Sequence, residues 1–80
     1  MNDEEIRERL TAVFRSVFDD ESIEVNSTTT AQDVEGWDSL AHIQLVVAIE
    51  KEFRVRFTML EVKRLKNVGD LFNLVQTKVG

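Results

Sequence analysis

The stretch Gly36-Trp37-Asp38-Ser39-Leu40 opens the most apolar part of this 80-residue chain. It leads into a dense run of apolar residues: Leu40, Ile43, Leu45, Val46, Val47, Ile49 and Phe53. This spacing predicts a partly buried helix from about Ser39 to Glu52, because apolar side chains recur on every turn. Either Asp38 or Ser39 can be its N-cap, since both residue types are preferred there. Ser39 therefore stands at a helix N-terminus, where unpaired N–H groups and the helix dipole suit an anion or a phosphoester.

The predicted helix is apolar on two sides. The side that we expect to be buried comprises Leu45, Val46, Ile49 and Phe53. The second stripe, about one helical face away, comprises Leu40, Ile43 and Val47. A second apolar side needs a second partner, because exposed apolar patches mark contact sites. That partner is a ligand, another protein or the connection that precedes the helix.

The first part of the chain predicts another helix. Asn2 with Glu5 fits a capping box in which the first residue is Asn, and a helix from about Asp3 to Phe18 follows. Its core-facing residues recur on one face, at Ile6, Leu10, Val13, Phe14 and Val17. The acidic run at 19–21 disfavours its continuation, since acids oppose the dipole at a helix C-terminus.

The last part of the chain carries two more helix starts. Thr58 and Glu61 form a capping box before a short helix, about Met59 to Leu65. A weaker cap signal, Asn67 with Asp70, precedes a last helix whose apolar face is Val68, Leu71, Phe72, Val75 and Val79. The expected fold class is all-α: a four-helix bundle with three longer helices, one short third helix and a long loop between helices one and two. That loop, residues 19–37, needs apolar anchors, for which the candidates are Ile23, Val25 and Val34.

Composition bounds the class of protein. Eighty residues with 42% hydrophobic content predict a single domain over 1–80 with one modest core. The formal net charge of −5 argues against a nucleic-acid partner. The sequence has no apolar run of membrane-spanning length, and it starts with acids where a secretory signal would be basic, so we expect a cytoplasmic protein without membrane contact. With no cysteine, the chain owns no thiol.

The charge is distributed unevenly along the chain. Residues 1–24 carry eight acids and three bases, residues 25–52 five and one, and residues 53–80 two and six. The net charges are therefore −5, −4 and +4. Two interpretations stay open: the two ends attract each other across the bundle, or the basic third forms a surface that selects partners.

A hydrolase would need Ser39 to be activated by a base, and the one histidine, His42, lies three residues further on the same helix face. The surrounding residues lack the glycine-flanked pattern of a nucleophile elbow, and no oxyanion hole is indicated. No metal ligand stands four residues after His42, so the sequence does not indicate a metal site. The sequence therefore favours a modified or binding serine over a catalytic one.

The order of helix caps, the mid-chain serine before an apolar helix and the missing thiol together resemble one family, the acyl carrier proteins. The centre of the resemblance is Asp38-Ser39-Leu40, which looks like the family's attachment motif, supported by Gly36 before it and by Glu50 and Glu52 after it. The resemblance covers nearly the whole chain. The Gly-Trp-Asp-Ser-Leu form is similar to stand-alone carriers of specialised biosynthetic pathways.

This resemblance implies a carrier and not an enzyme. Ser39 would be esterified by 4′-phosphopantetheine from coenzyme A, through a separate phosphopantetheinyl transferase and magnesium. Acyl groups would then be carried as thioesters on the thiol of that group. Asp38 would help the transferase to recognise the chain. The resemblance also implies apolar partner contacts at Leu40 and Val47, and an acyl-sheltering cleft between helices two and three formed by Ile43, Val62 and Leu65.

The chain departs from the many fatty-acid carriers that are acidic along helices two and three. The corresponding positions here are Ala41, Gln44, Met59, Leu60 and Lys63. A condensing enzyme that reads acidic residues through Arg and Lys would find fewer pairs and a repulsive Lys63. We therefore expect acyl-loading and acyl-processing enzymes of a dedicated pathway, polyketide, fatty-acid-like or other specialised metabolism, as partners of a monomeric carrier. The alternatives are an aminoacyl or D-alanyl carrier of the same fold, or an unmodified helical interaction module.

Overall fold

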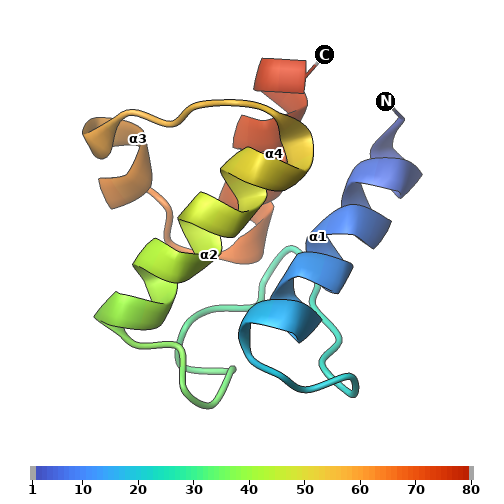
Figure 1. The fold of residues 1–80 in the computed structure, drawn as a ribbon, viewed down its shortest axis with the longest axis vertical. Coiled ribbons are helices and arrows are strands. Elements are labelled where there is room, and N and C mark those ends of the chain that lie inside the picture. The colour runs from blue at the N-terminus through green and yellow to red at the C-terminus, as the bar shows by residue number, and fades with distance from the viewer. Residues whose placement is uncertain (1, 80) are drawn as a thin grey trace.

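Four helices surround one hydrophobic core in the computed structural model, which describes residues 2–79. They are α1 (Asp3–Val17), α2 (Ser39–Phe53), α3 (Met59–Lys63) and α4 (Val68–Val79). No residue from 2 to 79 lies in a strand. α1 packs against both α2 and α4 and runs in the opposite direction to them (Figure 1). The predicted all-α fold, with its short third helix and long first loop, is confirmed.

The core is filled by one face of each longer helix. Its fully buried side chains are Ile6, Leu10, Phe14, Leu45, Ile49 and Val75. Each such side chain contributes about 1.5–3 kcal/mol relative to exposure. The side of α2 that was expected to be buried is buried, whereas Leu40, Ile43 and Val47 are 65%, 59% and 43% exposed. The long loop therefore does not cover the second stripe of α2.

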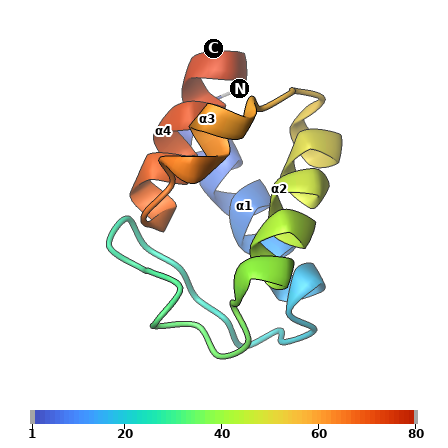
Figure 2. The ribbon, with the colours of Figure 1, turned by 90° about the vertical axis from the view of Figure 1, so that its left-hand side faces the viewer.

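The long loop, residues 18–38, lies beyond one end of the bundle, and Figure 2 shows it below the helices. Of its predicted anchors, Val34 is buried, and Ile23 and Val25 are partly buried and pack against the core. Arg15 adds a polar tie, because its Nε donates to the carbonyl of Ile23 at 2.8 Å. These contacts explain how nineteen predicted loop residues fit a small fold.

The middle of the loop also meets the start of α4. The amide of Val68 donates to the carbonyl of Thr29 at 2.9 Å, and the amide of Gly69 donates to the carbonyl of Ser27 at 2.9 Å. Thr29 is itself buried. The predicted cap of this helix is present as well, since Asn67 Oδ1 accepts from the amide of Asp70 at 2.8 Å. The first amides of α4 are thus satisfied by the loop and by its cap.

Helix ends differ from the prediction by one or two residues. α1 ends at Val17, with Phe18 as its C-cap. α3 ends at Lys63 and not at Leu65. Just after α3, the amides of Arg64 and Leu65 donate to the carbonyls three residues back, at Glu61 and Val62, so the chain tightens into a turn there.

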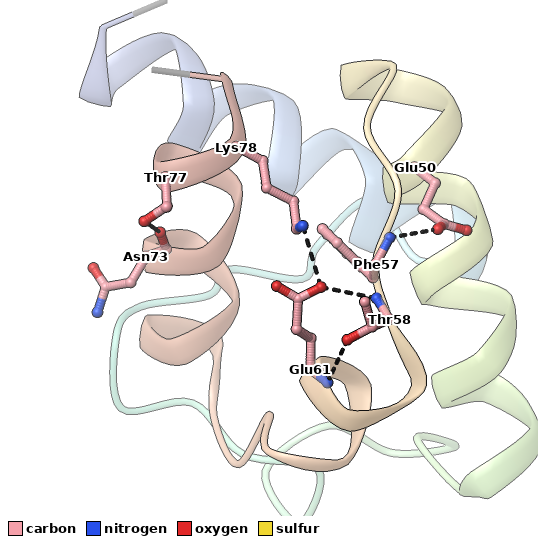
Figure 3. A network of polar contacts seen from close by, with 7 residues as sticks. All are labelled: Glu50, Phe57, Thr58, Glu61, Asn73, Thr77 and Lys78. Carbon is pink, nitrogen blue, oxygen red and sulfur yellow. Dashed lines mark hydrogen bonds and ion pairs between the residues drawn. The ribbon is translucent and has the colours of Figure 1, made fainter.

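None of the residues of α3 is buried. This short helix is held in place by the polar contacts that Figure 3 shows. The predicted capping box is present: Glu61 N donates to Thr58 Oγ1 at 3.1 Å, and Thr58 N donates to Glu61 Oε1 at 2.8 Å. Lys78 of α4 pairs with the same carboxylate at 3.1 Å, and Phe57 N donates to Glu50 of α2 at 2.8 Å. The hydrogen bond from Thr58 and the contact with Lys78 lower the pKa of Glu61. α3 is therefore tied to both neighbouring helices.

Gly69 provides a stability test of the contact between the loop and α4. A Cβ at this position would lie 2.7 Å from the Ser27 carbonyl oxygen, which is backbone and cannot easily move away. Helix propensity alone favours alanine over glycine by about 1 kcal/mol. We expect the clash to dominate, so that Gly69→Ala lowers the free energy of unfolding by about 1–2 kcal/mol in urea denaturation followed by circular dichroism.

Asn73→Ala, at an exposed position of the same helix, is the matched control and should leave stability unchanged or slightly raised. A Gly69→Ala variant that is more stable than the parent would show that the loop does not sit against α4 as described.

Candidate functional site: a serine at the start of α2

The N-terminus of α2 settles which residue is the cap. Asp38 is extended, and its Oδ1 accepts a hydrogen bond from the amide of Ala41 at 2.8 Å. Ser39 is consequently the first residue inside the helix, and it is exposed. No acid follows Asp38 in the first turn of α2. The helix dipole therefore acts on Ser39 without a competing carboxylate inside the helix.

Trp37 fixes the direction in which the chain enters α2. Its indole ring packs edge-on against Phe14, with centroids 5.3 Å apart, and lies 6.2 Å from Phe18. Gly36, just before it, has φ +86°, a region that glycine adopts without steric cost. The tryptophan thus anchors the end of the long loop to α1, and the glycine supplies the turn that this anchor requires.

His42 is engaged by the same tryptophan and is not a free surface side chain. Trp37 Nε1 donates to His42 Nδ1 at 3.2 Å, and the two rings stack with centroids 6.0 Å apart. An indole N–H can only donate, so Nδ1 accepts and the neutral imidazole keeps its proton on Nε2. A general base must instead offer the serine a ring nitrogen with a free lone pair, but here the lone pair of Nδ1 already accepts from Trp37 and Nε2 carries the proton. The geometry therefore disfavours activation of Ser39 by His42.

An open apolar cleft of about 720 Å³ lies between α2 and α3 beside Ser39. It is lined by Ala31, Trp37, Asp38, Ser39, His42, Ile43, Met59, Val62, Lys63 and Leu65. Five of the seven site residues predicted from the sequence meet in it: Asp38, Ser39, Ile43, Val62 and Leu65. The other two, Leu40 and Val47, are not part of its lining and lie on the exposed stripe of α2.

Sequence reasoning missed several of these neighbours. The pairing of Trp37 with His42 spans five residues and joins a loop to a helix, a spacing that helix periodicity does not indicate. Lys63 and Met59 were noted only as departures from an acidic pattern, although both line the cleft. Their spacing of four residues in a predicted helix is the signal that places them on one face.

Residues 2–79 show no sign of two other classes of site. No group of three or more His, Asp or Glu side chains is arranged to hold a metal ion there. Within the same residues, no helix has the length and apolar character needed to span a membrane.

Comparison with known proteins gives consistent matches over the same region. Residues 8–75 match the family model described as a phosphopantetheine attachment site. The chain is 30% identical to an acyl carrier protein of Prochlorococcus marinus (strain MIT 9515) over 80 residues, covering the whole of both chains. It is 34% identical to an acyl carrier protein of Thermosynechococcus vestitus (strain NIES-2133 / IAM M-273 / BP-1) over 81 residues, covering 99% of this chain and 98% of the relative.

The fold has a solved counterpart as well. The solution NMR structure of a holo acyl carrier protein from Geobacter metallireducens superposes with a TM-score of 0.86 and 45% sequence identity, covering 91% of this chain and 84% of that one. Together these matches confirm the predicted carrier function and its covalent 4′-phosphopantetheine. The chain belongs to the acyl carrier protein family.

Proposed function

We propose that Ser39 is the residue that bears 4′-phosphopantetheine and that residues 1–80 act as one acyl carrier domain. The sequence has four serines, Ser16, Ser22, Ser27 and Ser39. Ser39 alone begins a helix and lines the apolar cleft. Ser22 Oγ, by contrast, donates to Asp20 at 2.6 Å in the loop. The position of Ser39 is the observation that carries this proposal.

The surroundings of Ser39 fit such a group at both of its ends. A phosphodiester on the hydroxyl would lie at the positive end of the α2 dipole. Because Asp38 already holds the amide of Ala41, the phosphodiester depends on the dipole and on the remaining first-turn amides. When bound, the group supplies the thiol that this cysteine-free chain lacks. The apolar cleft beside it suits an acyl chain on that thiol.

The remaining predicted residues fall into two proposed roles. Ile43, Val62 and Leu65 line the cleft and would shelter the acyl chain from water, since burial of each methylene is worth about 0.8 kcal/mol. Leu40 and Val47, which are exposed, would contact partner enzymes. The partners are a phosphopantetheinyl transferase, and acyl-loading and acyl-processing enzymes of a dedicated biosynthetic pathway in the cytoplasm, which the carrier visits as a monomer.

The attachment residue is tested by loading the protein in vitro. Incubation with coenzyme A, magnesium and a broad-specificity phosphopantetheinyl transferase should add one phosphopantetheine group to the protein by intact mass. Ser39→Ala should gain none, because the accepting hydroxyl is absent, whereas Ser27→Ala should load fully. An adduct that persists in Ser39→Ala would show that another residue is modified.

Two substitutions of Asp38 distinguish its role as the helix cap from its proposed role in recognition by the transferase. Asp38→Ala should lower the free energy of unfolding by about 1 kcal/mol, because the cap to Ala41 is lost. Asp38→Asn keeps a capping side chain but removes the charge, so its stability should stay near that of the parent. If the transferase reads the carboxylate, both variants load more slowly. A normal loading rate for Asp38→Asn would restrict this residue to its structural role.

A further inference from the structure

The exposed large apolar residues described in this structure all lie on α2 and α3. They are Leu40, Ile43, Val47, Met59 and Leu60, and their exposed fractions range from 43% to 75%. Ser39 stands at the start of the same surface of α2. No other part of residues 2–79 presents large apolar side chains in this way. Such a concentration marks a contact surface whose partner is another molecule.

One cation belongs to this surface. Lys63 lines the cleft together with Ile43 and Met59, and it lies four residues after Met59, on the same side of α3. We call Leu40, Ile43, Val47, Met59 and Lys63 the docking surface. Leu60 and Arg64 extend this surface around α3, because they directly follow Met59 and Lys63 in the sequence. The docking surface is thus apolar in its centre and cationic toward the end of α3.

The acidic side chains of α2 and α3 already have hydrogen-bond or ion-pair partners within the protein. Glu50 accepts from the amide of Phe57 at 2.8 Å, and Glu52 pairs with Arg9 at 3.3 Å. Glu61, the one acid of α3, binds both Thr58 and Lys78. None of them is left to balance Lys63, which makes no ion pair with any residue from 2 to 79. The protein is acidic as a whole, yet Lys63 presents a positive charge to the cleft, whose one acidic lining residue, Asp38, caps the start of α2.

The basic residues near the C-terminal end of the chain do not form ion pairs with the acidic N-terminal part either. Residues 54–66 contain five bases and one acid. The ion pairs among residues 2–79 join Arg9 to Glu5, Arg9 to Glu52 and Lys78 to Glu61, and none of them links 1–24 to 53–79. Of the two interpretations of the uneven charge, attraction between the chain ends is therefore not supported by ion pairing, which favours a partner-selecting surface.

We propose that the acyl-processing partners of this carrier meet the docking surface with an apolar patch bordered by Asp or Glu residues that face Lys63. The proposal rests on the proposed function, since it assigns partners to the same serine. Complementary charge raises the association rate and excludes wrong partners. A partner with Arg or Lys at this position would instead be repelled by Lys63.

The test uses one condensing enzyme in two forms. The first form binds carriers through a patch of Arg and Lys, and in the second these residues are replaced by Glu. We expect the holo protein to bind the charge-reversed form about tenfold more tightly by isothermal titration calorimetry, and the preference to shrink at high salt. Lys63→Glu should abolish or invert the preference.

Lys51→Glu is the matched control. Lys51, like Lys63, is an exposed lysine in the last turn of its helix, but it lines a groove shared with α1. The two substitutions change the charge and the helix dipole interaction alike, so only Lys63→Glu should change partner preference. Equal binding to the two enzyme forms, binding to neither, or equal effects of the two substitutions would overturn the proposal.

Loading distinguishes this proposal from the one on which it rests. Each variant is first converted to its phosphopantetheine-bearing form with coenzyme A, magnesium and the transferase, and the conversion is checked by intact mass. Full conversion at Ser39 without the expected preference refutes only the acidic partner. Failure to modify Ser39 in the parent protein refutes the carrier site itself.

Discussion

α2 is apolar on two sides, and the fold can bury only one of them. Leu45, Ile49 and Phe53 enter the core against α1, which fixes the rotation of the helix about its own axis. Once that rotation is fixed, the stripe that begins at Leu40 must face outward. The exposed stripe and the exposed serine at the helix start are therefore consequences of core packing, and the binding surface does not require a separate structural element.

The long loop places the start of this helix. Trp37 is held by aromatic contacts with α1 and by its hydrogen bond to His42, so the residue before the cap has a fixed position. Farther back, the carbonyls of Ser27 and Thr29 receive the first amides of α4. One segment thus joins the N-terminal ends of two helices, and this explains how a connection without secondary structure can hold a reactive position in place.

Local signals made the helices and their caps predictable. Asn2, Thr58 and Asn67 each bond an amide three residues ahead, and such contacts can be read directly from the sequence. The position of Ser39 at the start of an apolar helix was predictable for the same reason. The contacts of Trp37 with α1 were not, because Phe14 and Phe18 are distant from it in sequence. The contacts of Glu50 with Phe57 and of Glu61 with Lys78, which leave neither acid to pair with Lys63, likewise could not be predicted from the sequence.

In the proposed function, α2 keeps one side in the core and offers the other, from Ser39 onward, to a prosthetic arm and its cargo. Amide NMR spectra of the unmodified protein and of the protein bearing a medium-chain acyl group test this most directly. Chemical-shift changes should concentrate in residues 39–43 and 62–65, around the cleft between α2 and α3. Changes centred instead on the groove between α1 and α4, near Leu10, Val25 and Phe72, would contradict this account.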